Sequence, residues 1–274
     1  METITGVAAG VPFTALPPAN PVDGAAPLVV TWHMVDAPRT DAAFAAALPM
    51  AGVPAWRVHL GLPMCGARMV DGGLDAVVAL AREDALLAFL APFVRQAAEE
   101  FPAALAALRE QLPVDHAPPG ILGGSLGGAV ALQVLVASVV PVGAVALVNA
   151  AVRVGSAVEL VEGLAGHPYA WTAEAERAAA ELDFVARVAD LASQPPLLLV
   201  SGEHDHARFR ADAVELVDAL RARYVHPDDI ELVAVPGLAH PLADEPGLEP
   251  AAQRPTARAV DAILTDWFRA RLTS

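Results

Sequence analysis

The sequence predicts an α/β fold in which a mostly parallel central sheet is flanked by helices on both faces. Short runs rich in Val, Ile and Leu alternate with longer stretches of helical pattern, which is typical of βα units. Runs such as 142–148 and 197–200 carry no polar side chain, as expected for strands buried on both faces of a parallel sheet. The 274 residues suffice for one large domain with a sizeable core, so we expect residues 1–274 to form a single domain.

Each element follows from its local pattern. The predicted strands occupy 11–16, 28–32, 56–60, 121–122, 142–148, 197–200 and 230–235. A helix is predicted over 40–48, and another over 84–111, in which Pro92 and Pro102 mark kinks or restarts. The last helix is predicted over 257–271, because its apolar residues recur at amphipathic spacing: Val260, Ile263, Leu264 and Phe268.

Two connections, 61–120 and 151–196, are too long for simple crossovers between neighbouring strands. Both leave the carboxyl edge of the predicted sheet, which is where ligands bind in such sheets. Connections of this length in a compact domain are often lids, and the second carries a helical pattern over 172–192. We therefore expect a helical cap inserted at about 151–196. Helices packed on the flank of the sheet are the alternative.

The composition excludes several classes of protein. A formal net charge of −15 argues against nucleic acid and anionic membranes as partners. The single cysteine, Cys65, excludes an intramolecular disulfide and a cysteine-built metal site. Pro141 and Gly143 divide the apolar stretch 129–152 into elements of ordinary length, so no membrane span is expected. The first residues do not resemble a signal peptide, which favours a cytoplasmic location. Assembly into a homo-oligomer is left open.

Residues 123–128 read Gly-Gly-Ser-Leu-Gly-Gly, between a short apolar run and a long apolar stretch. A serine at such a strand–helix turn sits in a strained conformation that exposes its hydroxyl, and the glycines Gly123 and Gly127 must be small there. The turn also directs the N–H of Leu126 toward the same point, so Ser125 has the geometry of an acyl-transfer nucleophile. A glycine-rich turn with an idle serine is the alternative. A phosphate loop would need a lysine, and a dinucleotide turn an acidic residue after the next strand, where this chain has asparagine.

A serine hydroxyl needs a base near its working pKa, which favours histidine. Among eight histidines, His240 is the best placed, in a glycine-containing loop directly after a predicted strand. The orienting acid is expected on a loop between serine and histidine, and Asp205 fits, with Glu203 as its rival. His204 and His206 flank this acid, but no further ligands of suitable spacing accompany them, so no metal is expected.

An acyl-transfer oxyanion needs two backbone N–H donors. Leu126 is the candidate for the first, and the loop after strand 28–32 supplies the second, with Met34 and Val35 as alternatives. Four side chains are expected in or beside the substrate pocket, from this loop, the histidine loop and the second long connection: His33, Leu238, Tyr169 and Trp171. Their character predicts an apolar, partly aromatic pocket.

Together these residues resemble the α/β-hydrolase superfamily of serine esterases, over about 28–271. The resemblance is carried by the G-x-S-x-G turn at Ser125, the G-x-x-D turn ending at Asp205, and the loop of His240, in that order. It implies a carboxylesterase-like enzyme in which these residues are nucleophile, orienting acid and base, and Leu126 is an oxyanion donor. One departure is that methionine follows His33, where many relatives have His-Gly, which leaves the second donor open.

The implied reaction is hydrolysis of a small-molecule carboxylic ester through an acyl-enzyme intermediate, without a metal or organic cofactor. The same triad serves amidases, peptidases, thioesterases and acyltransferases, because fold and triad do not set the substrate. A hydrolase-like fold that only binds a ligand is the alternative from another class.

Overall fold

The computed structural model of the chain describes residues 2–20, 24–165 and 168–272. Its centre is an eight-stranded sheet made of β1 (Ile4–Ala8), β2 (Val11–Leu16), β3 (Leu28–Trp32), β4 (Trp56–Leu60), β5 (Gly120–Gly124), β6 (Ala144–Val148), β7 (Leu197–His204) and β8 (Ile230–Ala239). The spatial order is β1-β2-β4-β3-β5-β6-β7-β8. Strand β2 pairs antiparallel with β1 and β4, and all other neighbours are parallel. The carboxyl ends of the parallel strands therefore meet at one edge.

The α/β prediction is confirmed, although several strand bounds differ: β6 begins two residues later than predicted, at Ala144, and β7 continues to His204. Strand β1 was not expected, because it is an edge strand with mostly exposed side chains and no apolar run. Strand β5 runs from Gly120 to Gly124, although its glycines have low strand propensity. Strand β8 continues to Ala239, directly before His240.

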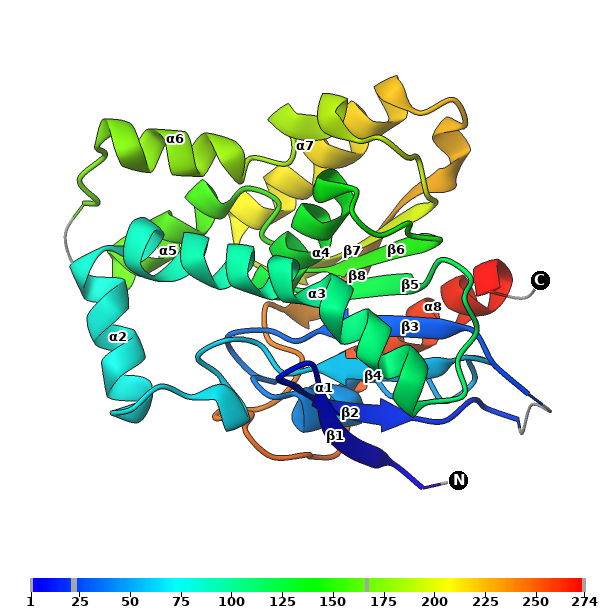
Figure 1. Cartoon of the computed structure of the whole chain (residues 1–274). Helices are drawn as coiled ribbons and strands as arrows, with labels where there is room; N and C mark the ends of the chain where they lie inside the picture. The colour runs from blue at the N-terminus through cyan, green and yellow to red at the C-terminus, as the bar shows by residue number, and fades with distance from the viewer. Residues whose placement is uncertain (1, 21–23, 166–167, 273–274) are drawn as a thin grey trace.

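Helices cover both faces of the sheet (Figure 1). On one face lie α1 (Asp41–Ala47) and α8 (Pro255–Leu272), whose Phe44 and Phe268 pack in a core with the sheet. On the other lie α3 (Ala91–Gln111), α4 (Leu126–Ala137) and α7 (Ala207–Arg223), which share a larger core with it. A parallel sheet buried on both faces follows, as its uninterrupted apolar strands predict.

The helix predicted over 84–111 is two elements, a π-helical segment η2 (Ala85–Leu90) followed by α3. Asp84 begins η2, because its carboxylate accepts the N–H groups of Leu86 and Leu87 at 3.1 and 2.7 Å. Pro92 lies in the first turn of α3, where its missing N–H costs little. Pro102 lies inside α3 without ending it.

The two long connections hold further helices. The first contains η1 (Gly66–Arg68) and α2 (Gly73–Glu83) before η2, and the second contains α5 (Val154–Ala165), α6 (Ala173–Glu181) and η3 (Ala186–Asp190). The predicted helical pattern over 172–192 is thus a capped helix and a short 3-10 turn. Figure 1 shows α2, α5 and α6 grouped at its left, beyond the ends of the strands.

The apolar stretch 129–152 is divided as predicted, between α4 and the buried strand β6. Within the described ranges, no helix combines the length and apolarity that crossing a membrane requires.

Candidate active site

Ser125 occupies the turn between β5 and α4 with φ 51° and ψ −121°, a conformation that costs a non-glycine residue free energy. The glycines around it are required by close approach of backbones. A Cβ on Gly123 would lie 2.1 Å from the carbonyl O of Gly127, at the start of the helix. A Cβ on Gly127 would lie 2.4 Å from the carbonyl O of His33, so this glycine is forced by the loop after β3. The turn thus holds the serine where strand, helix and loop converge.

The structure brings Ser125, His240 and Asp205 together in one hydrogen-bonded chain, here called the relay. Ser125 Oγ and His240 Nε2 are 2.8 Å apart, and His240 Nδ1 and Asp205 Oδ1 are 2.6 Å apart. All three residues are buried. Because the carboxylate can only accept, Nδ1 of His240 carries the proton and Nε2 is left to accept the serine hydroxyl.

The acid at the relay is Asp205 and not its rival Glu203. Asp205 Oδ1 also accepts the N–H of His206 at 2.6 Å, which fixes the carboxylate. Glu203 is exposed and turns away to accept the N–H of Gly237 at 3.0 Å. A backbone N–H therefore holds the Asp205 carboxylate beside the imidazole, and another holds the Glu203 carboxylate away from it.

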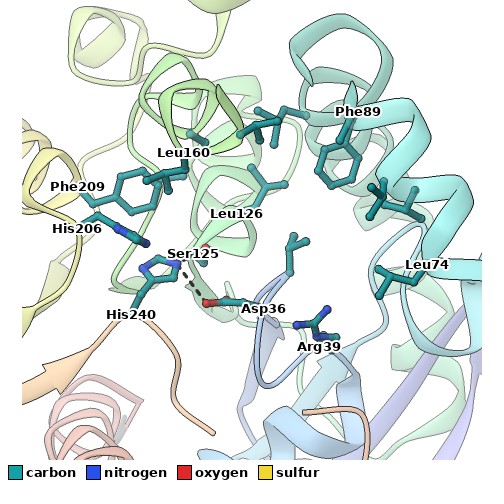
Figure 2. Close-up of a pocket in the computed structure, with 18 of the residues that line it drawn as sticks. Asp36, Arg39, Leu74, Phe89, Ser125, Leu126, Leu160, His206, Phe209 and His240 are labelled. Atoms are coloured by element: carbon teal, nitrogen blue, oxygen red, sulfur yellow. Dashed lines mark hydrogen bonds and ion pairs between the residues drawn. The ribbon is translucent and has the colours of Figure 1, made fainter. Parts of the chain in front are cut away.

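Two opposing effects act on His240. Burial disfavours the imidazolium and would lower its pKa, but the hydrogen bond to Asp205 and the charges of Asp36 and Asp205 together raise that pKa above its usual value of 6.5. Asp36 contributes from a distance of 3.8 Å, measured from its Oδ2 to His240 Nε2. Figure 2 shows the carboxylate of Asp36 directed at the imidazole beside Ser125.

Asn149 joins the strand ends that carry the relay, and sequence reasoning did not assign it a role at the site. Its Nδ2 donates to the carbonyls of Ala239 and His240 at 2.9 and 3.0 Å, and its Oδ1 accepts the N–H of Gly202 at 2.7 Å. Asn149 is buried, and its backbone has a φ of 46°, in the left-handed region. The sign of this role in the sequence is a single asparagine directly after the apolar strand β6.

The loop after β3 is braced by His33. Its Nε2 accepts the N–H of Leu62 at 3.1 Å, so its Nδ1 carries the proton and donates to the carbonyl of Met34 at 2.6 Å. Burial lowers the pKa of His33 to about 4, which keeps this imidazole neutral. Met34 is fully buried beside the nucleophile turn, whereas Val35 lines the adjacent cavity.

A cavity of about 640 Å³ extends from the relay between α2, η2 and α5 (Figure 2). Most of its walls are apolar and come from both long connections: Leu74, Val77, Val78, Ala81, Phe89, Leu90, Ala157, Leu160 and Val161. Ser125, Leu126 and His240 lie at one end, and the charged side chains of Asp36, Arg39 and Arg82 also contribute to the lining.

The four side chains predicted for the pocket lie outside this lining, so the predicted set of pocket residues is corrected here. His33 is buried under the loop that it braces, and Leu238 is fully buried in the core, where it packs on Gly202. Tyr169 instead bonds Asp84 at 2.5 Å and packs edge-on against Trp171, with ring centroids 5.0 Å apart. These two aromatic residues fasten the second connection to the start of η2. The apolar, partly aromatic character predicted for the pocket comes instead from aliphatic side chains with Phe89 and Phe209.

The potential ligand atoms of Asp205, His206 and His240 lie within 4.8 Å of one another, as those of a metal site would. A metal would compete with the 2.6 Å hydrogen bond that joins Asp205 to His240. His206 is exposed. The chemistry of this group therefore fits proton transfer through the imidazole better than metal ligation.

Comparison with known proteins places the chain in a family. A model of the prolyl oligopeptidase family matches residues 95–271, well over half of the chain, and this range includes the whole relay. The chain belongs to the prolyl oligopeptidase family. The match begins within α3, so α2, η2 and the first four strands of this family member lie outside it. No curated protein matches the chain significantly.

Solved structures give the fold of this family member. TT1662 from Thermus thermophilus is 20% identical with a TM-score of 0.64, and the alignment covers 99% of this chain and 100% of that one. A puromycin-hydrolyzing peptidase of Mycobacterium tuberculosis is 17% identical with a TM-score of 0.66, over 98% of this chain but 39% of that one. A dienelactone hydrolase of Anabaena variabilis is 17% identical with a TM-score of 0.57, over 99% and 98%. The chain has the α/β-hydrolase fold, and its family supports serine hydrolase activity.

Proposed function

We propose that this chain is a serine hydrolase that cleaves carboxylic esters through an acyl-enzyme intermediate. In this proposal Ser125 is the nucleophile, His240 the general base and Asp205 the acid that orients the imidazole. The observation that carries the proposal is the relay of two short hydrogen bonds, at 2.8 and 2.6 Å, ending at the wall of an apolar cavity. An idle serine would need neither the strained backbone nor the buried imidazole.

In the first step Ser125 Oγ attacks the ester carbonyl carbon while its proton passes to His240 Nε2. The imidazolium is stabilised by the Asp205 carboxylate at Nδ1. His240 then gives this proton to the departing alkoxide oxygen, and the acyl group stays on Oγ. Water attacks in the second step, and the same imidazole takes its proton and returns a proton to Oγ as the acid leaves.

The oxyanion is proposed to be held by the backbone N–H groups of Leu126 and Val35. Both residues line the cavity, and among the described residues neither N–H donates a hydrogen bond to another group. Met34, the other candidate, is buried in the core behind the turn. Losing one donor of such a hole raises the barrier by roughly 3–4 kcal/mol.

The apolar walls support an ester with a hydrophobic acyl or alcohol group. Recognition of a peptide backbone requires polar partners along the cleft, whereas most side chains that line this cavity are apolar. Peptide cleavage is the second candidate, favoured by the match to the prolyl oligopeptidase family. Thioester cleavage and acyl transfer use the same relay and stay alternatives.

The cap predicted at 151–196 becomes a roof of two parts in this proposal. Helix α5 of that segment supplies one wall, and α2 with η2 of the first connection supplies the other, which is supported by their shares of the cavity lining. The single-domain organisation and the cytoplasmic location stay predictions, and assembly into a homo-oligomer stays open.

The test is a panel of esters, an aminoacyl anilide and a thioester, run with purified wild-type protein and variants. We expect the ester to be the best substrate and Ser125→Ala to lose about six orders of magnitude in kcat. Asp205→Asn is expected to lose roughly four orders of magnitude. Glu203→Gln, the matched control two residues away, is expected to keep wild-type turnover. A preference for the anilide would favour the peptidase, and turnover that survives Ser125→Ala would refute both.

A further inference from the structure

Asp36 is a carboxylate inside the cavity that the steps above do not use. It follows Val35 in the loop after β3, and its Oδ2 lies 3.8 Å from His240 Nε2, on the side where the imidazole meets Ser125 (Figure 2). Its Oδ1 is buried and accepts no hydrogen bond from any described residue. A second carboxylate thus faces the nitrogen that transfers protons.

Two donors next to Asp36 are taken up by Glu245. The guanidinium of Arg39 forms an ion pair with Glu245, and the N–H of Ala37 also points to Glu245, at 3.4 Å. The other carboxylate oxygen, Oδ2, lies 3.8 Å from His240 Nε2 at the cavity, so it is placed to accept a hydrogen bond from a molecule bound between the two side chains. Because most of the cavity wall is apolar, a polar molecule that enters the site finds its partners at this end.

We infer that Asp36 holds the water molecule that hydrolyses the acyl-enzyme, which rests on the ester hydrolysis proposed above. A water oxygen can lie about 2.8 Å from both a carboxylate oxygen and an imidazole nitrogen when these are 3.8 Å apart, as Asp36 Oδ2 and His240 Nε2 are. Once Ser125 is acylated, its Oγ has no proton to give, and Nε2 is open to that water. Asp36 and His240 then supply two of the polar partners that an ordered water needs.

The step balances with the groups present. The water donates one hydrogen bond to Asp36 and the other to His240 Nε2, which leaves its lone pair directed at the acyl carbon. A C–O bond forms to the carbonyl carbon as the proton facing Nε2 moves to the imidazole. The tetrahedral intermediate collapses, the bond from the acyl carbon to Ser125 Oγ breaks, and the imidazolium returns its proton to Oγ. The second proton of the water leaves with the carboxylic acid product.

The pair of Asp36 and His240 is expected to favour water over an alcohol as the nucleophile that attacks the acyl-enzyme. Water has two protons and can satisfy Asp36 and His240 together, whereas methanol has one, which His240 must take for the attack. The carboxylate therefore favours water over an alcohol in the acyl-enzyme. A residue that only supports the loop would slow attack by both nucleophiles equally.

The experiment measures how the acyl-enzyme partitions between water and methanol. A p-nitrophenyl ester and a phenyl ester of the same acid are turned over at fixed methanol concentration, and free acid and methyl ester are quantified at early times. Asp36→Leu removes the carboxylate at similar side-chain size, and Asp36→Ala is the second variant if the first does not fold. Asp244→Asn removes an exposed carboxylate, 88% accessible, as the matched control.

We expect the ratio of methyl ester to acid to rise about fivefold or more in the Asp36 variants, as for the loss of one hydrogen bond. The ratio is expected to be equal for the two leaving groups and unchanged in Asp244→Asn. A ratio that stays at the wild-type value in the Asp36 variants overturns the inference and leaves the proposed function standing. A wild-type ratio that depends on the leaving group, or no turnover of either ester, overturns the acyl-enzyme and this inference with it.

Discussion

Asn149 is the side chain whose removal tests how the relay is held in place. It makes three hydrogen bonds from one buried position, to the carbonyls of Ala239 and His240 and from the N–H of Gly202. These partners belong to the ends of β8 and β7, which carry His240 and Asp205. Asn149→Ala therefore removes the side-chain link between β6 and these two strand ends, and leaves the three side chains of the relay in place.

The expected cost follows from those contacts. Leaving a buried partner unsatisfied costs about 1–3 kcal/mol, so two carbonyls and one N–H together predict a loss of at least about 3 kcal/mol in the free energy of unfolding. The φ of 46° at Asn149 adds strain for alanine, about 1 kcal/mol or slightly more. Asn149→Gly loses the same hydrogen bonds without that strain, so it is expected to be more stable than Asn149→Ala by about that amount.

The assay is urea unfolding followed by tryptophan fluorescence, together with kcat on an activated ester. A shift of His240 by a fraction of an ångström is expected to lower kcat by up to about 100-fold. Gln253→Ala is the control, because the amide that it removes bonds the carbonyl of Ala47 at 3.0 Å and the carboxylate of Asp261, both away from the relay. The reasoning is refuted if Asn149→Ala loses no more stability than this control, or if it keeps wild-type kcat.

Three further predictions concern the base, the cavity and the nucleophile turn. Because the pKa of His240 is raised above 6.5 and the base must be neutral, kcat/KM should rise with pH along an acid limb above pH 6.5. Asp36→Asn should lower the midpoint pH of that limb, because it removes a charge that favours the imidazolium. A midpoint that is unchanged or higher in this variant would contradict the prediction. Leu160→Trp should fill part of the cavity, so that kcat/KM for long acyl esters falls about tenfold or more relative to acetate; an equal loss for all chain lengths would count against the cavity as the acyl site. Gly123→Ala places a Cβ 2.1 Å from a backbone carbonyl, so the variant should be insoluble or melt far below the wild type by circular dichroism, and a normal melting temperature would disprove the close approach.

The parts of the fold that could be predicted are those set by local pattern. Buried parallel strands such as β6 and β7 are continuous apolar runs, and α8 has regular amphipathic spacing. Strand β1 is exposed and gains its structure from pairing with β2. The division of 84–111 between the π-helical η2 and the α-helix α3 leaves the run of apolar residues unbroken. Contacts with other parts of the folded chain decide these features, and the spacing of apolar residues in the sequence does not predict them.

The residues of the site also differ in whether local sequence could predict them. Ser125, Asp205 and His240 could be proposed because each follows its own strand, and parallel strands bring their carboxyl ends to one edge. The pocket residues could not, because Tyr169 and Trp171 have the aromatic character of a pocket but pack on each other and on Asp84. Asn149 and Asp36 were missed because each acts through a neighbour that lies close only in the folded chain.

The most direct test of the relay is covalent labelling with a fluorophosphonate, read by intact mass and peptide mapping. The account predicts one adduct per chain on Ser125, formed rapidly in wild-type protein and much more slowly in His240→Ala. Protein that stays unlabelled, or that carries its adduct on another residue, would contradict the proposal that Ser125 is an activated nucleophile.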